Sequence, residues 1–439
     1  MKTSHAGLLS LYKEILSPMW IKETAAELEL RVPGGIYNWV VVLWLMISQR
    51  LQPQGTLANA VEGAIGGSCG SLLRQRHRRK LSSRTGGYCR ARQRMPEEIV
   101  TAAVEELTRS LQAKLNPGGA KRAVYLLDGT SLQLPHEKNL LERFPPMRNK
   151  QGKSHWPVLR MVVAQEARSG LAIAPAWGPL FGEHAVSEQA LAEQVLEGLP
   201  AGAVVIGDRN FGVFSTAHAI DRGGRKALIR MTRKRAEKIA GGPLRAGSEQ
   251  RLIWRPSSVE LRRHPQLTPE TCVEGRLLAY QLAGQRELLY LFTTWNEGSS
   301  QEILEHYGWR WKVETDLRSL KQTVGLHRVQ VKSEAMLKKE LLAAVAAYNL
   351  VQTIISMAVQ PLGWHPRELS FTHAWNLVQV FLPVLLEPPS RHRREELRVL
   401  IRAVQEGRLP KRSKSRSYPR EVWSRGYRYP TRHGERNGK

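Results

Sequence analysis

The chain has 439 residues and a hydrophobic fraction of 42%, which is enough for two to four domains with packed cores. It carries 66 Lys and Arg against 39 Asp and Glu, giving a formal net charge of +27 and a pI near 10.4. Such a basic chain favours a polyanionic partner, either nucleic acid or an acidic membrane surface. The 3 cysteines lie far apart in the sequence, which excludes a disulfide framework and a Cys-x-x-Cys metal site.

The first 118 residues are predicted to be mostly helical, since apolar residues recur at helical spacing in 8–19, 37–47 and 97–115. Between the last two lies RQRHRRKLSSRTGGYCRARQR, residues 74–94, with 9 arginines and lysines. Arginines at this density repel one another without an anion, so we interpret the segment as a phosphate contact rather than a solvated loop. The residues expected to touch DNA there are Arg76, Arg78, Arg79 and Lys80.

From residue 122 the pattern changes to strands that alternate with helices, which predicts an α/β layer. The expected strands are 123–127, 158–163 and 204–206, with a helix at 187–196. Residues 222–296 then change to short strand-like runs separated by Gly and Pro, which indicates a β-rich insertion. Helices are expected at 299–323 and 338–359.

The two most apolar segments are not predicted to cross a membrane. Residues 36–47 are too short to span a bilayer. Residues 341–359 are long enough, but a polar stripe recurs along them at helical spacing: Asn349, Gln352, Thr353 and Ser356. This stripe is typical of a buried core helix in a soluble protein, so we expect no membrane partner.

Two aspartates follow short apolar runs. Asp128 is expected to end a strand in YLLDGTS, and Asp208 lies between a strand and a helix in AVVIGDRNFG. Either residue alone is as well explained by a turn or a helix N-cap. Together they suit a two-metal site, which needs carboxylates from adjacent strands and for which Mg²⁺ prefers oxygen ligands.

A helix in the segment HYGWRWKVETDLRSLKQTVGLHRV carries four functional side chains on one face. Arg310, Glu314 and Lys321 follow Tyr307 by 3, 7 and 14 residues, and at ~100° per residue they fall within roughly 60° of one another. The simpler interpretation is a solvated face with an Arg310–Glu314 ion pair, worth a few tenths of a kcal/mol. That interpretation leaves Tyr307 and Lys321 unexplained.

The pattern Tyr-x2-Arg-x3-Glu-x6-Lys, preceded by LDGTS and GDRNFG, resembles the signature of a large branch of bacterial insertion-sequence transposases with a DDE catalytic domain. The resemblance covers about residues 120–360. It implies an α/β fold with an RNase H-like mixed sheet and flanking helices, interrupted by a β-rich insertion and preceded by a helical N-terminal domain. It also implies that Asp128, Asp208 and Glu314 hold two Mg²⁺ ions, for which Mn²⁺ can substitute.

The same resemblance assigns Tyr307, Arg310 and Lys321 to phosphates at the transposon end. Other candidate DNA contacts are weaker. Trp311 is a possible base contact beside Arg310, whereas Trp254 and Tyr290 in the insertion could stack on a base but are expected in the core. For His184 and Glu188, between the two aspartates, we expect structural roles.

The expected organisation has five parts: a DNA-binding domain at 1–118, a catalytic core at 119–221 and 297–385, an insertion at 222–296, and a basic tail at 386–439. The expected activity is metal-dependent cleavage at transposon ends and strand transfer into target DNA. The expected partners are the terminal inverted repeats, target DNA and a second copy in a synaptic homodimer. The N-terminus lacks a signal-peptide pattern, so a bacterial cytoplasmic, nucleoid-associated protein is expected.

Two alternatives share these features. An RNase H-like nuclease without strand transfer would use the same metal chemistry. A catalytically silent DNA-binding descendant of a transposase would keep the charge, although loss of an acidic residue would favour it and all three are present.

Overall fold

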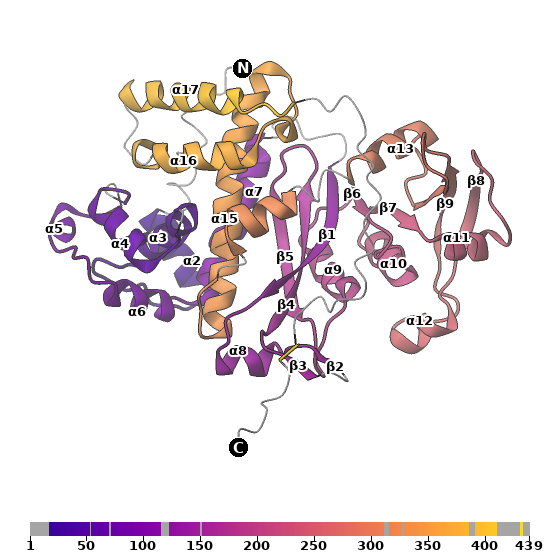
Figure 1. Cartoon of the computed structure of the whole chain (residues 1–439), viewed down its shortest axis with the longest axis horizontal. Coiled ribbons are helices and arrows are strands. Elements are labelled where there is room, and N and C mark those ends of the chain that lie inside the picture. The colour runs from indigo at the N-terminus through magenta and orange to yellow at the C-terminus, as the bar shows by residue number, and fades with distance from the viewer. Residues whose placement is uncertain are drawn as a thin grey trace.

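The computed structural model describes residues 17–52, 54–69, 72–115, 123–149, 152–310, 316–326, 329–385, 391–410 and 431–432. Figure 1 shows a group of N-terminal helices on one side of the long helix α15 (Glu334–Val359) and a sheet on the other. The N-terminal helices are α2 (Pro18–Glu27), α3 (Trp39–Leu51), α4 (Leu57–Ile65), α5 (Gln75–Arg78), α6 (Gly86–Arg94) and α7 (Glu97–Leu115). The helices expected at 37–47 and 97–115 are confirmed, whereas most of 8–19 lies outside the described residues.

One sheet of eight strands runs through the rest of the protein, in the order β5-β4-β1-β6-β7-β10-β9-β8. Its strands are β1 (Val124–Gln133), β4 (Val158–Glu166), β5 (Ala172–Pro179), β6 (Val204–Gly207), β7 (Lys226–Met231), β8 (Glu249–Trp254), β9 (Val273–Tyr280) and β10 (Leu289–Thr293). β6 pairs in parallel with β1 and β7, and the other neighbours are antiparallel. The predicted mixed sheet with flanking helices is confirmed, and it is compatible with an RNase H-like domain.

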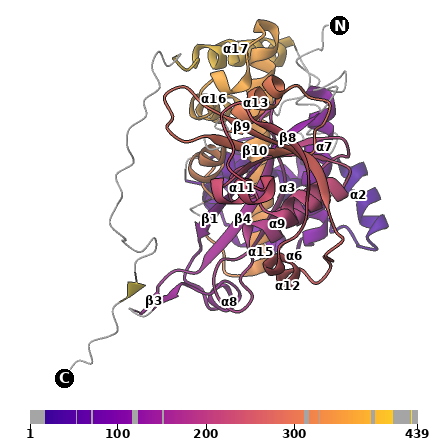
Figure 2. The ribbon, with the colours of Figure 1, turned by 90° about the vertical axis from the view of Figure 1, so that its right-hand side faces the viewer.

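Helices cover both faces of this sheet because its strands alternate apolar side chains to the two sides. Val124 and Leu126 pack toward α13 (Ser300–Gly308), whereas Tyr125 and Leu127 pack toward α9 (Glu188–Glu197) and α10 (Phe214–Arg222). The remaining short elements are β2 (Arg148–Asn149), β3 (Gly152–Ser154), β11 (Thr431–Arg432), α8 (Lys138–Arg143), α11 (Arg233–Ala240), α12 (Ser258–Arg263), η1 (Ser319–Thr323), η3 (Gln360–Leu362) and η4 (Pro366–Glu368). Figure 2 views the sheet from its β8 end, with α13 above the strands and α12 below them.

The strands between residues 222 and 296 extend the same sheet. β7 joins β6 in parallel, and β10, β9 and β8 follow in antiparallel order to the far edge. This segment is rich in strands, as the sequence indicates, and its strands share the hydrogen-bond ladder of the sheet that carries the two aspartates. The segment assigned to the basic tail begins with α17 (Arg391–Glu406), which packs on α16 (Phe371–Leu385) and buries Leu397, Leu400 and Val404.

The prediction that Asp128 ends its strand is wrong. β1 continues to Gln133 because its antiparallel partner β4 pairs with it from Tyr125 to the end. The parallel partner β6 stops at Gly207, so only the β4 side of β1 is paired beyond Leu126. Asp128 therefore lies inside a strand, at the point where its neighbour on one side has ended.

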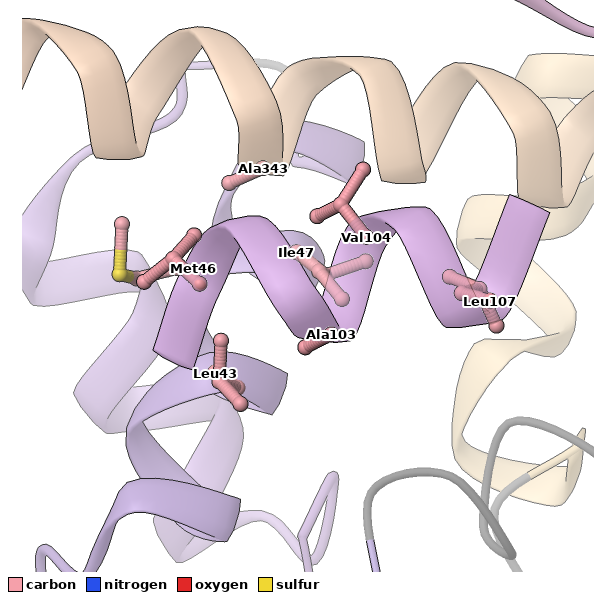
Figure 3. Close-up of a pocket in the computed structure, with 8 residues that line it drawn as sticks. Leu43, Met46, Ile47, Ala103, Val104, Leu107 and Ala343 are labelled. Carbon is pink, nitrogen blue, oxygen red and sulfur yellow. The ribbon is translucent and has the colours of Figure 1, made fainter. Parts of the chain in front are cut away.

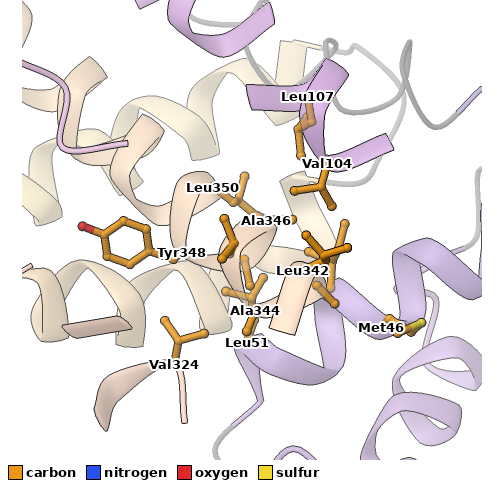
Figure 4. Close-up of a cluster of buried hydrophobic side chains, with 14 of the residues drawn as sticks. Met46, Leu51, Val104, Leu107, Val324, Leu342, Ala344, Ala346, Tyr348 and Leu350 are labelled. Atoms are coloured by element: carbon orange, nitrogen blue, oxygen red, sulfur yellow. The ribbon is translucent and has the colours of Figure 1, made fainter. Parts of the chain in front are cut away.

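α15 is the only helix of the described residues long and apolar enough to cross a membrane, and the apolar part of it is entirely buried inside the protein. It packs on α3 and α7 on one side and contacts β5 on the other. Figure 4 shows Leu342, Ala346 and Leu350 of α15 beside Val104 and Leu107 of α7. Figure 3 shows a small apolar cavity where α3, α7 and α15 meet. The predicted core role of this helix is confirmed.

The polar stripe of α15 is used to hold the edge of the sheet. Asn349 Oδ1 accepts a hydrogen bond from Ala172 N at 2.8 Å, and Asn349 Nδ2 donates to Ala172 O at 2.9 Å. This amide therefore pairs with β5 as a neighbouring strand would, and it covers an edge that could otherwise recruit another chain. Ser356 adds a hydrogen bond to Ser169 O, at the turn before β5.

We predict that Asn349→Ala lowers the free energy of unfolding by about 2 to 4 kcal/mol, because it leaves two buried backbone groups of Ala172 unpaired. Urea denaturation followed by circular dichroism measures this change. Gln301→Ala removes an exposed amide on α13 and serves as the control. A loss no larger than that of the control would contradict the role of Asn349 at the β5 edge.

Candidate active site

The register between β1 and β6 places the two aspartates at the same level of the sheet. Leu126 is paired with Ile206, and each aspartate lies two residues further along its chain. Parallel neighbours are roughly 4.8 Å apart, so Asp128 and Asp208 lie side by side. By alternation along the strand, Asp128 shares the face of Val124 and Leu126, which is the face that α13 covers.

The turn after β6 fixes Asp208. Asp208 Oδ1 accepts a hydrogen bond from Asn210 N at 2.7 Å, and its carbonyl accepts from Phe211 N at 3.1 Å. Phe211 is buried under the turn, and a side chain in place of Gly212 would collide with the carbonyl oxygen of Arg230 on β7. The sequence GDRNFG therefore holds this carboxylate in a closed, hydrogen-bonded turn rather than in an open loop.

Glu188 also reaches this site, which the sequence did not indicate. It is the first residue of α9, and its Oε2 accepts a hydrogen bond from Asn210 Nδ2. Its carboxyl lies directly over Gly129, where an added Cβ would be 2.8 Å from Glu188 Cδ. Only a glycine after Asp128 leaves room for it. Glu188 thus lies between Gly129, the residue after Asp128 on β1, and Asn210 in the turn after β6.

The electrostatics of Asp128 reflect this crowding. The pKa of Asp128 is raised from 3.8 to about 6, chiefly by burial, and the nearby charges of Asp208 and Glu188 act in the same direction. The hydrogen bond from Gly129 N, at 2.8 Å, and the charge of Arg310 act in the opposite direction. Asp208 and Glu188 thus add negative charge near the buried Asp128 carboxyl, with partial compensation from the Arg310 guanidinium, and a cation would stabilise this arrangement.

Tyr307 and Arg310 lie against the same face. Tyr307 is the last aromatic residue of α13 before Gly308 and is 0% exposed. Burial raises the pKa of the Tyr307 hydroxyl to about 12, although the charges of Arg310 and Arg230 act to lower it. The charge of Asp208 acts to raise the pKa of the same hydroxyl. The structure thus brings together Asp128, Asp208, Tyr307 and Arg310, as the sequence predicted.

Lys321 contacts β1 further along the strand. It lies in η1, a short π-helical segment of the kind that often occurs at functional sites. Its Nζ donates a hydrogen bond to Ser131 O at 2.6 Å, so the ammonium is held against β1 a few residues beyond Asp128. The remaining predicted residues of this helix, Trp311 and Glu314, lie outside the described residues.

The other candidate DNA contacts divide into exposed and buried residues. Arg76, Arg78, Arg79 and Lys80 are exposed, on and just after α5. Trp254 and Tyr290 are buried, and Trp254 packs edge-on against Phe214 and Phe292. The expected core role of Trp254 and Tyr290 is confirmed.

The donor set fits a hard divalent cation, because it consists of carboxylate oxygens. Among the described residues, no three His, Cys, Asp or Glu side chains are grouped closely enough to hold a metal ion as they stand. The expected third ligand, Glu314, is not among those residues. Asp128 and Asp208 are therefore two neighbouring carboxylates that could serve as ligands.

We predict that Asp128→Asn stabilises the metal-free protein at pH 8 by about 1 to 3 kcal/mol. The folded-state pKa of Asp128 lies above its ordinary value, so its stabilising contribution is full below 3.8 and is lost as the pH rises through about 6. The amide keeps the hydrogen bond from Gly129 N but has no charge to bury. Urea denaturation in EDTA at pH 8 and pH 4.5 measures the difference. A gain of equal size at both pH values would contradict this account.

Comparisons with known proteins agree with this geometry. Residues 119–350 match the family model described as the transposase DDE domain. Over 353 residues the chain is 27% identical to the transposase InsG for insertion sequence element IS4 of Escherichia coli strain K12, covering 78% of this chain and 77% of that protein. The matched segment contains Asp128, Asp208 and residues 307–321. The chain therefore belongs to the DDE transposases, enzymes that act on DNA.

Proposed function

We propose that Asp128, Asp208 and Glu314 bind two Mg²⁺ ions and carry out cleavage at transposon ends and strand transfer into target DNA. The observation that carries this proposal is the register of β1 and β6, which aligns the first two carboxylates on neighbouring strands. When bound, the two cations activate the attacking water or 3′-hydroxyl and stabilise the leaving oxygen. Mn²⁺, which also accepts oxygen ligands, can replace Mg²⁺.

The raised pKa of Asp128 supports a cation at this place. Neighbouring negative charges oppose ionisation of Asp128, and a divalent cation between the carboxylates would reverse that effect. Asn210 and Gly129 donate backbone hydrogen bonds to Asp208 and Asp128, so both carboxylates keep fixed orientations without the metal. The protein thus supplies a rigid donor set before its substrate arrives.

Arg310 and Lys321 are proposed to bind the phosphates of the transposon end. Arg310 can form a two-pronged contact with a phosphate and lies near Asp128, and Lys321 is held against β1. Tyr307 is fully buried and close to Arg310, so we assign it the role of orienting that guanidinium. Trp311 is proposed as a base contact beside Arg310.

A basic groove next to the Asp208 turn gives DNA a path across the protein. It lies between α9 and the segment 232–264, and Val213 lines its inner end. Its cationic side chains are Lys234, Arg235, Lys238, Arg255 and Arg263. These cations would attract phosphates, and Val213, which lines the groove, follows Asp208 closely in the chain; both points support a DNA-binding role for residues 222–296 as the β-rich insertion of an RNase H-like core.

The wider organisation follows from the need to join two ends. Residues 1–118 are proposed to bind the terminal inverted repeats, with Arg76, Arg78, Arg79 and Lys80 on phosphates. Two copies of the chain are proposed to hold two ends in a synaptic homodimer. The substrate places the protein at the nucleoid of the bacterial cytoplasm.

We predict that the protein cuts a labelled duplex at the boundary of its element's terminal repeat in Mg²⁺, and that Glu314→Ala and Asp208→Asn abolish detectable cutting. In EDTA both variants should bind the duplex at least as tightly as the wild type, because without the metal ions each substitution only removes a negative charge. Gel analysis of cleavage and a filter-binding measurement on the same samples separate the two effects.

The second half of the reaction needs its own assay. A pre-cut end with a free 3′-hydroxyl should be joined to supercoiled plasmid by the wild type and not by Glu314→Ala. Cutting without joining would replace the proposal with the nuclease alternative. Binding without cutting in both Mg²⁺ and Mn²⁺ would replace it with the silent DNA-binding protein.

A further inference from the structure

Helix α6 is attached to the rest of the protein through a buried cluster of charges. Arg92 on its inner face contacts Glu340 of α15 at 2.7 Å, and Arg50 Nε of α3 donates to the same carboxylate at 2.8 Å. Gln49 Oε1 accepts hydrogen bonds from Tyr88 at 3.1 Å and Arg92 at 3.2 Å. Glu340 is 1% exposed, so breaking these contacts would leave a buried charge without compensation.

Lys339 of α15 fixes the end of the same helix. Its Nζ donates to three backbone carbonyls at the end of α6: Arg92 O at 3.0 Å, Gln93 O at 3.1 Å and Met95 O at 2.8 Å. These contacts satisfy carbonyls that a helix end leaves unpaired. Two consecutive residues of α15, the core helix that also holds β5, therefore set the position and the direction of α6.

The opposite face of α6 projects outward. Tyr88 and Arg92 are buried, whereas Arg90, Gln93 and Arg94 are exposed. At ~100° per residue these three fall on one side of the helix, within roughly 100° of one another. Figure 1 shows α6 below α3, on the side of α15 away from the sheet. A nine-residue helix is thus rigidly mounted with long hydrogen-bonding side chains on its free face.

The surroundings of this face are strongly basic. Eight of the nine arginines and lysines in residues 74–94 are exposed, Arg92 being the ninth. No Asp or Glu occurs between residues 63 and 96 to neutralise them. The surface therefore attracts a polyanion, and the exposed Arg76, Arg78 and Arg79, on and just after α5, precede α6 in the chain.

We propose that α6 lies in the major groove of the terminal repeat and that Arg90, Gln93 and Arg94 read its bases. Arginine pairs with two acceptors of guanine, and glutamine with the donor and acceptor of adenine, so these side chains carry sequence information. The arginines around α5 contact phosphates and position the duplex. This inference rests on the proposed binding of transposon ends and adds the helix that recognises them.

Because α6 is attached to α15, the binding of bases by α6 also affects where the DNA is cut. α15 also pairs with β5 through Asn349, so the reading helix and the sheet carrying Asp128 and Asp208 are mounted on one rigid helix. The distance from the bases that are read to the phosphodiester that is cut is thereby set by the protein. A hinge between the two would leave the cutting position undefined.

The test compares affinities for the repeat duplex and for a duplex of the same composition in scrambled order, at one salt concentration. The variant Arg90→Ala/Gln93→Ala/Arg94→Ala is expected to lose about tenfold or more of the preference for the repeat. The matched variant Arg76→Ala/Arg78→Ala/Arg79→Ala also removes exposed side chains. It is expected to weaken binding to both duplexes equally and to flatten the dependence on salt.

A conservative variant separates base recognition from charge. Arg90→Lys keeps the charge but loses the two-pronged contact, so it should reduce the preference while binding the scrambled duplex as the wild type does. If the α6 variant weakens both duplexes equally and keeps the preference, the inference is wrong. If the wild type still cleaves the repeat, the proposed function stands although the inference about α6 is wrong. If the wild type shows neither a preference for the repeat nor cleavage, the proposed function and the inference about α6 are both wrong.

Discussion

The proposed catalytic site depends on the parallel pairing of β1 with β6. That register places residues 128 and 208 at one level of the sheet, and a shift of one residue would turn one carboxylate to the other face. The pairing is held by apolar side chains on both faces, with α9 and α10 on one and α13 on the other. Two acidic groups are therefore kept together by buried hydrophobic neighbours, against their own repulsion.

The repulsion between these acidic groups is unfavourable as long as no cation lies near them. The protein does not relieve it with a full set of opposing charges, since Asp208 and Glu188 both raise the pKa of Asp128 and Arg310 compensates only in part. Instead, hydrogen bonds from the backbone N–H groups of Gly129 and Asn210 hold the two aspartate carboxylates in place. The metal-free site is thus electrostatically unfavourable and conformationally fixed, which is the combination that binds a divalent ion tightly.

α15 connects this site with the N-terminal helices. Its apolar side chains pack against α3 and α7, its Asn349 completes the edge of β5, and Lys339 and Glu340 at its start hold α6. A helix that would pass for a membrane span by composition is used here as the internal support of a DNA-binding enzyme. Its polar residues explain the difference, because each has a partner inside the protein.

The sequence by itself determined the chemistry of this protein. Spacing alone predicted Tyr307, Arg310 and Lys321 on one helical face, and apolar runs before Asp128 and Asp208 indicated two strands, because these patterns follow from local geometry. In the structure Tyr307 lies in α13, which ends at Gly308, and Lys321 lies in the separate segment η1. The family resemblance then supplied the expected RNase H-like fold and the expected metal ligands Asp128, Asp208 and Glu314, which composition could not. The helices at 37–47 and 97–115 and the core role of 341–359 also followed from periodicity and a polar stripe.

Tertiary structure alone decided the features that depend on contacts between segments far apart in the chain. β1 runs past Asp128 because β4 pairs with it, and local sequence contains no sign of that partner. Glu188 looks like an ordinary first residue of a helix until the fold brings α9 over Gly129. Arg92 is one of nine basic residues in its segment, and only its burial against Glu340 shows which face of α6 is free. Pairing and burial between remote segments are long-range properties, and a local pattern does not encode them.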